Sequence, residues 1–288
     1  MNHTYTIQEI ILENFNGIKN VTLENLPENA SWIFLTGENG YGKTSILKGI
    51  ASSLAGWESH TLGKFSENCC LRTKLHQEDH SYSIQNSPNI NTFKDQKNKF
   101  HYLACYGSSR LDTYSVSSKI ESENTVTKSL YDSQTYLMNI ENNFRNWFYK
   151  EKHRDSQQKY KFVKTLLKDI LNLKDIEIDY NTEKVYYIEK DDRGESYERM
   201  TLDGLASGYR SIIAMIGDMI LRLFEAQPEV HNPSDLVGIV IIDEIDLHFH
   251  PKWQKKLPEL LSKYFPKIQF IASTHSPIPL LGAPKHSV

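Results

Sequence analysis

Hydrophobic and polar residues alternate at the start of the chain and then change their spacing. Residues 7–17 alternate and end in a turn, and residues 21–26 repeat the alternation. This pattern predicts a β-hairpin. A continuous apolar run at residues 32–35 comes next, and residues 44–54 carry apolar side chains at helical spacing. The chain therefore begins with sheet and continues as strand, loop and helix.

The remaining apolar segments predict a mixed fold. Residues 130–173 show helical spacing with a polar break near 151–158, which favours two or three helices, and residues 176–189 alternate as a strand pair. Residues 101–106 and 238–242 are continuous apolar runs of the kind buried in a parallel sheet, and a further such strand begins at Ile268. We expect an α/β fold with a mixed or parallel central sheet, an N-terminal antiparallel β subdomain and a helical lobe.

Two stretches have little apolar patterning. Residues 57–100 are polar, with a short strand expected only at 82–84, and residues 115–127 are rich in hydroxyl side chains and predict a mobile loop. Cys69, Cys70, His76 and His80 suggest zinc, but the cysteines lack the usual intervening residues, which favours a partly exposed loop. With Cys105 as the third cysteine, no disulfide framework is expected, and a reducing compartment fits.

Composition narrows the function further. Of 288 residues, 39% are hydrophobic, and 33 basic against 36 acidic side chains give a net charge of −3, so nothing draws the whole chain to nucleic acid. Residues 145–168 hold eight Lys or Arg against two acids. They form either a solvated helical face or a patch for nucleic acid or a partner.

A membrane location is not expected. The first residues lack a charged segment followed by an apolar one, and the longest apolar stretch, residues 236–242, is too short to span a bilayer. We expect a cytoplasmic protein without a membrane partner.

Residues 37–44 read G-x-x-x-x-G-K-T, a complete phosphate loop between the predicted strand and helix. Glycines at 37, 40 and 42 let successive backbone N–H groups face a triphosphate, and the start of the helix adds its positive end. Lys43 would reach the β- and γ-phosphates, which makes it a candidate catalytic residue, and Thr44 would offer its hydroxyl to Mg²⁺. The full candidate set for the nucleotide here is Gly37, Glu38, Asn39, Gly40, Tyr41, Gly42, Lys43, Thr44 and Ser45.

Two later strands end in polar residues that suit the same chemistry. Asp243 and Glu244 follow the apolar run 238–242; in a phosphate-loop enzyme the first holds Mg²⁺ and the second orients and deprotonates the attacking water. His275 follows the strand that begins at Ile268, where it could bond the γ-phosphate or be structural. We take Glu244 and His275 as candidate catalytic residues.

Residues 205–210, LASGYR, lead into an apolar helix expected at residues 211–224. Small residues at a helix start expose backbone N–H groups and form an anion site; the alternative is an ordinary helix cap by Ser207.

The order of these four motifs, phosphate loop, LASGYR, IIDE and STHSP, resembles the ATP-binding head of the ABC class, in the branch of the RecF, Rad50, SMC and OLD proteins. LENFNG at residues 12–17 and DEIDLHFHP at 243–251 are similar to motifs of that branch. The resemblance implies that Ser207 and Gly208 of one subunit close over ATP held by another, so that a homodimer or higher homo-oligomer forms. It also implies adenine specificity, with Phe15 and Asn16 near the base, and Asn16 joins the candidate set.

YGSSR at residues 106–110 and the Tyr-Arg of LASGYR resemble small ATPases of bacterial anti-phage systems, such as the Septu and retron-associated ATPases. The resemblance implies an enzyme that binds ATP and Mg²⁺, hydrolyses ATP and regulates a partner effector, plausibly a nuclease. The alternative is a DNA-binding repair ATPase of the RecF type, with residues 145–168 on nucleic acid; a transporter subunit ranks third.

Three features depart from the family pattern. Ala206 stands where a serine usually touches the γ-phosphate, no glutamine is recognised after residue 106, which leaves Arg110 as a candidate γ-phosphate sensor, and the chain stops 13 residues after His275. We expect one ATPase head over residues 1–288. Its core would be residues 1–56 and 201–288, with a variable segment at 57–110, an inserted helical lobe and hairpin at 111–200, and further C-terminal residues outside this sequence.

Overall fold

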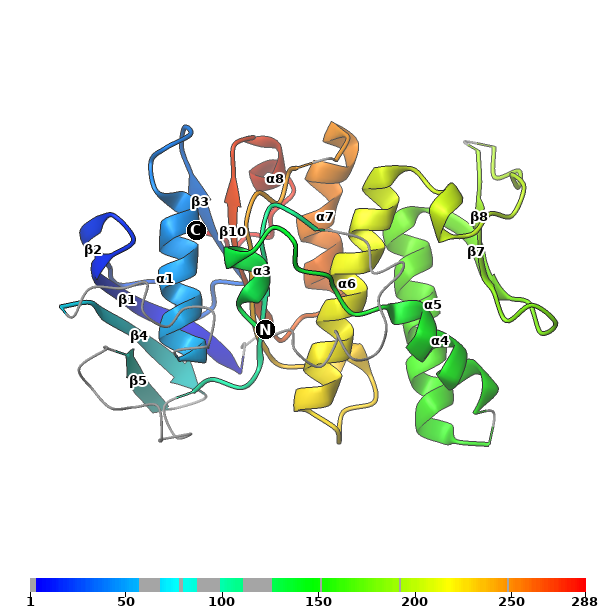
Figure 1. The fold of residues 1–288 in the computed structure, drawn as a ribbon, viewed down its shortest axis with the longest axis horizontal. Helices are drawn as coiled ribbons and strands as arrows, with labels where there is room; N and C mark the ends of the chain where they lie inside the picture. The colour runs from blue at the N-terminus through cyan, green and yellow to red at the C-terminus, as the bar shows by residue number, and fades with distance from the viewer. Residues whose placement is uncertain are drawn as a thin grey trace.

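The predicted N-terminal hairpin belongs to a four-stranded antiparallel sheet. The structure is a computed structural model that describes residues 4–56, 68–77, 80–86, 99–110, 126–150, 152–191, 193–247 and 249–288. The strand order is β2-β1-β4-β5, as the left side of Figure 1 shows. The strands are β1 (Tyr5–Phe15), β2 (Ile18–Leu23), β4 (Cys70–Gln77) and β5 (His80–Asn86).

The loop expected around Cys69, Cys70, His76 and His80 is wrong. β4 pairs with both β1 and β5, and its buried residues alternate along the strand. Polar outward-facing side chains such as Arg72 and Lys74 concealed this period in the sequence. Among the described residues, no cluster of three or more His, Cys, Asp or Glu side chains could hold a metal ion.

A second, all-parallel sheet lies in the middle of the fold, with strand order β3-β10-β9-β6. Successive residues of these strands face two separate cores, so that Ile241 packs with α1 and the antiparallel sheet, whereas Ile242 packs with α6 and the lobe. The strands follow the predicted runs: β3 (Trp32–Thr36), β6 (Leu103–Tyr106), β9 (Gly238–Ile242) and β10 (Ile268–Thr274).

Gly238 begins β9 with a backbone angle that excludes other residues. Its φ is +149°, and a Cβ there would lie 2.4 Å from the carbonyl oxygen of Tyr102. The glycine thus lets β9 start beside the chain that leads into β6, and the Ile239 amide bonds the Tyr102 carbonyl at 2.9 Å.

Helices cover both faces of the parallel sheet. α1 (Lys43–Ala55) packs between the two sheets, and α6 (Ser207–Ala226) and α7 (Pro251–Tyr264) lie on the other side (Figure 1). α7 begins at Pro251, and the His250 side chain caps it by accepting from the Lys252 amide. Short helices α3 (Lys128–Tyr131) and α8 (Ile278–Leu281) and the 3-10 turns η3 (Leu202–Gly204) and η4 (Pro233–Asp235) complete the core.

The helical lobe projects from the core beyond α6. It consists of α4 (Ile140–Tyr149), α5 (Arg154–Leu171) and the hairpin of β7 (Leu173–Ile178) and β8 (Val185–Glu189), which agrees with the predicted helices and strand pair. α5 begins within the polar break expected at 151–158, and Asn172 ends it in the left-handed conformation that asparagine tolerates.

A buried carboxylate joins the lobe to the core. Asp218 on α6 is fully buried and accepts from the Tyr106 hydroxyl at 2.8 Å, from the Met138 amide of the lobe at 2.8 Å and from Arg222 Nε at 2.6 Å. Burial, and next the charge of Asp218, raises the pKa of Tyr106 well above its usual value. β6, α6 and the start of α4 are therefore held in one network.

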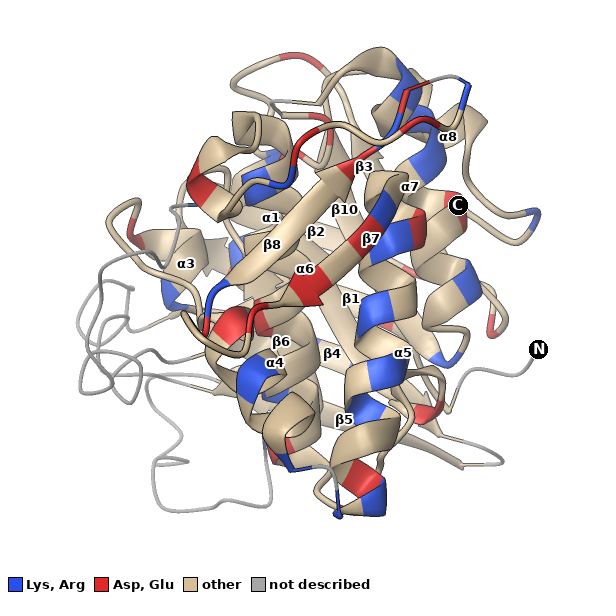
Figure 2. Ribbon diagram, turned by 90° about the vertical axis from the view of Figure 1, so that its right-hand side faces the viewer, with Lys and Arg blue, Asp and Glu red and all other residues tan. Residues whose placement is uncertain are grey.

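The basic residues of 145–168 gather on the lobe, as the blue positions on α5 in Figure 2 show. Two of them share one acidic partner, because Lys164 and Lys168 each lie 3.1 Å from Asp175 Oδ1. A third, Lys159, lies over the ring of Phe224. Part of the segment is thus a packed and paired helical face, while the nucleic-acid role of the remainder stays a prediction.

Most of the loop predicted at residues 115–127 lies outside the described residues. In the part of the chain that is described, no helix is both long and apolar enough to cross a membrane.

Candidate functional site

The phosphate loop connects β3 to α1 through three glycines in the left-handed region. Gly37, Gly40 and Gly42 have φ values of +146°, +85° and +83°, and nothing lies within 4 Å of a Cβ added to any of them. Glycine is needed for the backbone angles and not for space. No side chain caps the start of α1, where Gly42 is the N-cap, so the first amides of the helix remain open to an anion.

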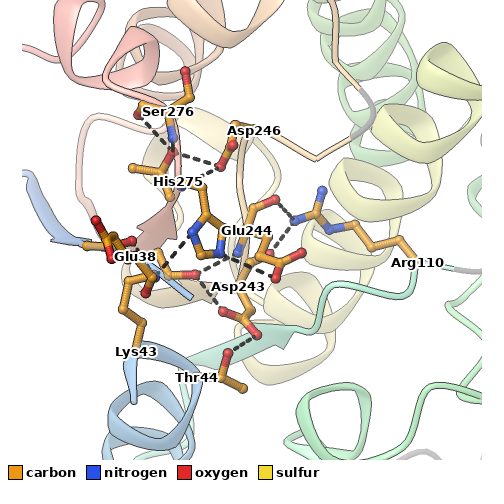
Figure 3. Close-up of polar contacts among 12 residues, drawn as sticks. Glu38, Lys43, Thr44, Arg110, Asp243, Glu244, Asp246, His275 and Ser276 are labelled. Carbon is orange, nitrogen blue, oxygen red and sulfur yellow. Dashed lines mark hydrogen bonds and ion pairs between the residues drawn. The ribbon is translucent and has the colours of Figure 1, made fainter. Parts of the chain in front are cut away.

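The Lys43 side chain folds back over this loop. Its ammonium donates to the carbonyl oxygens of Gly37 at 2.7 Å and Glu38 at 2.9 Å, and it lies 3.3 Å from His275 Nδ1 (Figure 3). Because an ammonium only donates, Nδ1 accepts, and the proton of a neutral His275 ring then sits on Nε2. Lys43 thus joins the phosphate loop to the end of β10.

Thr44 and Asp243 bring two oxygen ligands together. The Thr44 hydroxyl donates to Asp243 Oδ2 at 2.8 Å, and Ser273 donates to the other oxygen, Oδ1. Asp243 is almost fully buried. A hydroxyl and a carboxylate beside a phosphate loop are the donor set that Mg²⁺ prefers, so these residues fit the ion.

Glu244 occupies a sharp turn at the end of β9. Its φ is +49°, the left-handed region that few residues other than glycine adopt. β10 holds this turn from one side, because the Glu244 amide donates to Ser273 Oγ at 2.7 Å and the Ile245 amide donates to the Ser273 carbonyl at 3.0 Å. The Glu244 carboxylate lies 3.6 Å from His275 Nε2, just beyond hydrogen-bonding distance.

His275 is held by residues around the end of β10. Asp246 Oδ1 accepts from the His275 amide at 3.3 Å and from the Thr274 hydroxyl at 2.7 Å, and Thr274 Oγ1 accepts from the Ser276 amide at 3.0 Å. These bonds fix the backbone that carries the imidazole between Lys43 and Glu244 (Figure 3).

Two adjoining cavities open along this line of residues. The first, about 310 Å³, is lined by the phosphate loop together with Glu244 and His275. The second, about 580 Å³, shares Asn39 and His275 with it and continues toward Leu280 on α8. The lining residues of the first cavity are Asn39, Gly40, Gly42, Lys43, Thr44, Ser45, Glu244 and His275.

Other predicted residues lie around the cavities. The Asn16 amide donates to Ser45 Oγ at 3.1 Å, which places the β1-β2 turn beside the first turn of α1. Tyr41 is 75% exposed on the loop. The expectation that Phe15 lies near the base is wrong, because its ring is fully buried in the core between α1 and the antiparallel sheet.

Ser207 and Gly208 line neither cavity. They begin α6, whose start lies on the same upper side of the molecule as the phosphate loop but with α7 and α8 between them (Figure 1). A cap by Ser207 is wrong, since Ala206 is the N-cap and no side chain caps this helix. The helix also starts earlier than the predicted residue 211, shortly after the turn η3.

Arg110 does not reach the cavities. Its Nη2 donates to the backbone carbonyls of Asp243 at 2.6 Å and Glu244 at 3.0 Å, and the residue is buried behind them. The expectation of a γ-phosphate sensor at Arg110 is therefore wrong. Burial lowers the pKa of this guanidinium to about 10, while Asp243 and Glu244 act in the opposite direction, so it stays charged at neutral pH.

Sequence reasoning missed Ser273 and Asp246 as parts of the site. Ser273 connects Asp243 to Glu244, and Asp246 holds the backbone at His275. Both lie within two residues of a predicted site residue, and that proximity was the available signal.

The fold and the arrangement of these residues match the P-loop head of the ABC type. A solved structure of the recombination mediator protein RecF with ATPrS supports the fold, with a TM-score of 0.51, 11% identity and coverage of 100% of this chain and 96% of RecF. The resemblance to the RecF branch is thus confirmed at the level of fold.

The chain belongs to the AAA_21 family, described as "AAA domain, putative AbiEii toxin, Type IV TA system", which matches residues 75–279. It is 30% identical to the Septu protein PtuA of Bacillus mycoides (strain KBAB4) over 96% of this chain and 39% of PtuA. It is 47% identical to the retron Vc95 probable ATPase of Vibrio cholerae serotype O1 biovar El Tor over 28% of this chain and 16% of that protein. The chain thus spans less than half the length of these two relatives, and the predicted relation to Septu and retron ATPases is confirmed.

Proposed function

We propose that this chain binds Mg-ATP between the phosphate loop and the ends of β9 and β10 and hydrolyses it. The observation that carries the proposal is the convergence of Lys43, Glu244 and His275 on one cavity, beside the 2.8 Å contact of Thr44 with Asp243. The names of relatives, a retron probable ATPase and RecF solved with ATPrS, support ATP as the nucleotide.

Each residue has a defined part in this proposal. Lys43 and the open amides at the start of α1 bind the phosphates, while Thr44 and Asp243 hold Mg²⁺. Mg²⁺, when bound, neutralises phosphate charge in phosphoryl transfer. Glu244 accepts a proton from the attacking water, and the imidazole of His275 bonds the γ-phosphate from its position beside Lys43.

We also propose that two heads close around ATP and that closure regulates a partner effector, a nuclease, in anti-phage defence. The exposed start of α6, with Ser207 and Gly208, has uncapped amides suited to an anion but does not line the cavities of its own chain. A second copy would present this end to the bound nucleotide. The relation to the Septu and retron proteins supports the defence role. We keep the predicted division of the head in this proposal. Residues 1–56 and 201–288 form the core, residues 57–110 a variable segment, and residues 111–200 the inserted lobe and hairpin.

The test compares wild-type protein with Glu244→Gln. We expect wild type to hydrolyse ATP and the variant to lose about 10²- to 10⁴-fold in turnover, because the amide cannot take up the proton. Light scattering of Glu244→Gln should show dimers only with Mg-ATP. Glu259→Gln, an exposed position on α7, is the matched control and should behave as wild type.

Two results would contradict the proposal. Equal turnover in Glu244→Gln and wild type would remove Glu244 from the chemistry and favour a nucleotide-gated switch. An unchanged mass on adding Mg-ATP would exclude ATP-driven closure of two isolated heads.

A DNA-binding repair ATPase of the RecF type is the second candidate. Lys150, Lys152 and Arg154 are exposed at the connection between α4 and α5, and this favours it. The pairing of Lys164 and Lys168 with Asp175 weakens it. The test is salt-dependent binding to duplex DNA by variants in which these side chains are neutralised. If each neutralised side chain lowers the slope of log binding constant against log salt concentration by about one, the second candidate is established.

A further inference from the structure

Arg110 lies behind the turn that carries the proposed water-activating carboxylate. It follows β6, which pairs with β9, and the amide of Asp243 continues that pairing by donating to the Tyr106 carbonyl at 2.8 Å. One nitrogen, Nη2, donates to two consecutive carbonyls, of Asp243 at 2.6 Å and Glu244 at 3.0 Å (Figure 3). The guanidinium therefore holds both peptide groups that flank the Glu244 Cα atom.

This turn needs support on both sides. Glu244 has a φ of +49°, and a side chain in the left-handed region crowds its own backbone, so a free turn would relax toward negative φ. On the N–H side, Ser273 accepts from the Glu244 amide and, through its carbonyl, from the Ile245 amide. On the C=O side, the contacts are those of Arg110.

Two other nitrogens of the guanidinium have no hydrogen-bond partner among the described residues. These are Nε and Nη1 of Arg110, which are buried because the residue is only 9% exposed. A buried cation with unused donors is costly, and its lowered pKa has the same origin. Within the described part of the chain, the hydrogen bonds that Arg110 makes are directed at the Asp243-Glu244 backbone, and a charged donor strengthens each of them.

We propose that Arg110 is a positioning residue that fixes the Asp243-Glu244 turn, so that the Glu244 carboxylate faces His275 and the nucleotide cavity. The proposal rests on the proposed ATP hydrolysis. Arg110 touches neither cavity, so it acts on turnover through Glu244 and leaves nucleotide binding to the phosphate loop. A displacement of about 1 Å in a reacting group costs about 10²-fold in rate.

The kinetic test uses full-length Arg110→Met, Arg110→Lys and the control Arg199→Met. Arg199 lies 3.6 Å from Asp179 and over the Tyr186 ring, away from the cavities. We expect Arg110→Met to lose about 10²-fold in kcat with KM for ATP within threefold of wild type, because only positioning is lost. Arg110→Lys, which keeps a charged donor, should recover about tenfold, and Arg199→Met should match wild type. Wild-type kcat in Arg110→Met, or a loss carried by KM, would overturn the proposal.

A second measurement does not depend on turnover. Hydrogen–deuterium exchange should be at least about tenfold faster at the amides of residues 243–246 in Arg110→Met, and unchanged there in Arg199→Met, because the turn loses one of its two supports. Unchanged exchange would show that Arg110 does not hold the turn. If wild type has no ATPase activity but exchange is faster in Arg110→Met, the proposed function fails. The support of the turn by Arg110 then still stands.

Discussion

The cavity that we propose for the nucleotide has two walls that are built in different ways. The phosphate-loop wall, residues 36–45, is one continuous segment whose shape comes from glycines with positive φ and whose polar groups are mainly backbone amides. The strand-end wall, residues 243–246 and 273–276, joins two segments through side chains, chiefly Ser273 and Asp246. The first wall is suited to holding phosphates and the second to placing a base, so damage to each should have a different kinetic signature.

Removal of the charge on the phosphate-loop wall should have the largest effect. Lys43→Ala takes away the ammonium that bridges the loop carbonyls and His275, and we expect kcat/KM for ATP to fall about 10³-fold, with weaker ATP binding as part of the loss. Calorimetric titration with ATP and steady-state turnover measure the two parts. Lys48→Ala, one turn further along α1, is the control. Undiminished ATP affinity in Lys43→Ala would show that the loop wall does not carry binding.

On the strand-end wall, Ser273→Ala should lower turnover and spare binding. The substitution removes the acceptor for the Glu244 amide and the donor to Asp243 Oδ1, so we expect kcat to fall about 10²-fold while the ATP dissociation constant changes less than threefold. Ser262→Ala removes a partly buried hydrogen bond outside the site, in which Ser262 Oγ accepts from Trp32 Nε1 at 2.8 Å, and serves as the control. Equal losses in binding and turnover would abolish the distinction between the walls.

The smallest effect is expected at Gly42, where a substitution tests whether ATP binding by the loop wall depends on the backbone angle of this residue alone. Gly42→Ala adds a methyl group at φ +83°, where space is free but the left-handed conformation costs about 1–2 kcal/mol, so ATP should bind about tenfold more weakly. Gly42→Asn should lose less, because asparagine tolerates this region. A larger loss for asparagine than for alanine would mean that size, not φ, governs the loop.

Local patterns were sufficient for most of the fold. Continuous apolar runs predicted β3 and β9, alternation predicted the β7-β8 hairpin, and helical spacing predicted the lobe. Prediction failed at β4, where polar residues such as Arg72 and Lys74 face outward and hide the buried Leu71 and Leu75. Strand pairing with β1, a contact far along the chain, stabilises that segment and leaves little trace in its own composition.

The site also has residues that local patterns predicted and residues whose roles depend on distant contacts. Glu244 and His275 were predicted from their places at strand ends, and parallel pairing of β9 with β10 brings those ends together. The sequence offered Arg110 only as a candidate γ-phosphate sensor, and the structure shows that this candidate is wrong. The structure turns its side chain to the carbonyls behind the turn, because β6 lies beside β9 on the side away from β10.

The phosphate loop, the strand-end carboxylates and the class of protein could be predicted from the chain alone, because they depend on residue types at short, regular spacing. The folded structure was needed to show which residues support Glu244, that Ser207 lies away from its own phosphate loop, and that Asp218 links the lobe to the core. Those features arise where distant segments meet, and a hydrogen bond between distant segments depends on sheet order and helix packing, which no local pattern records.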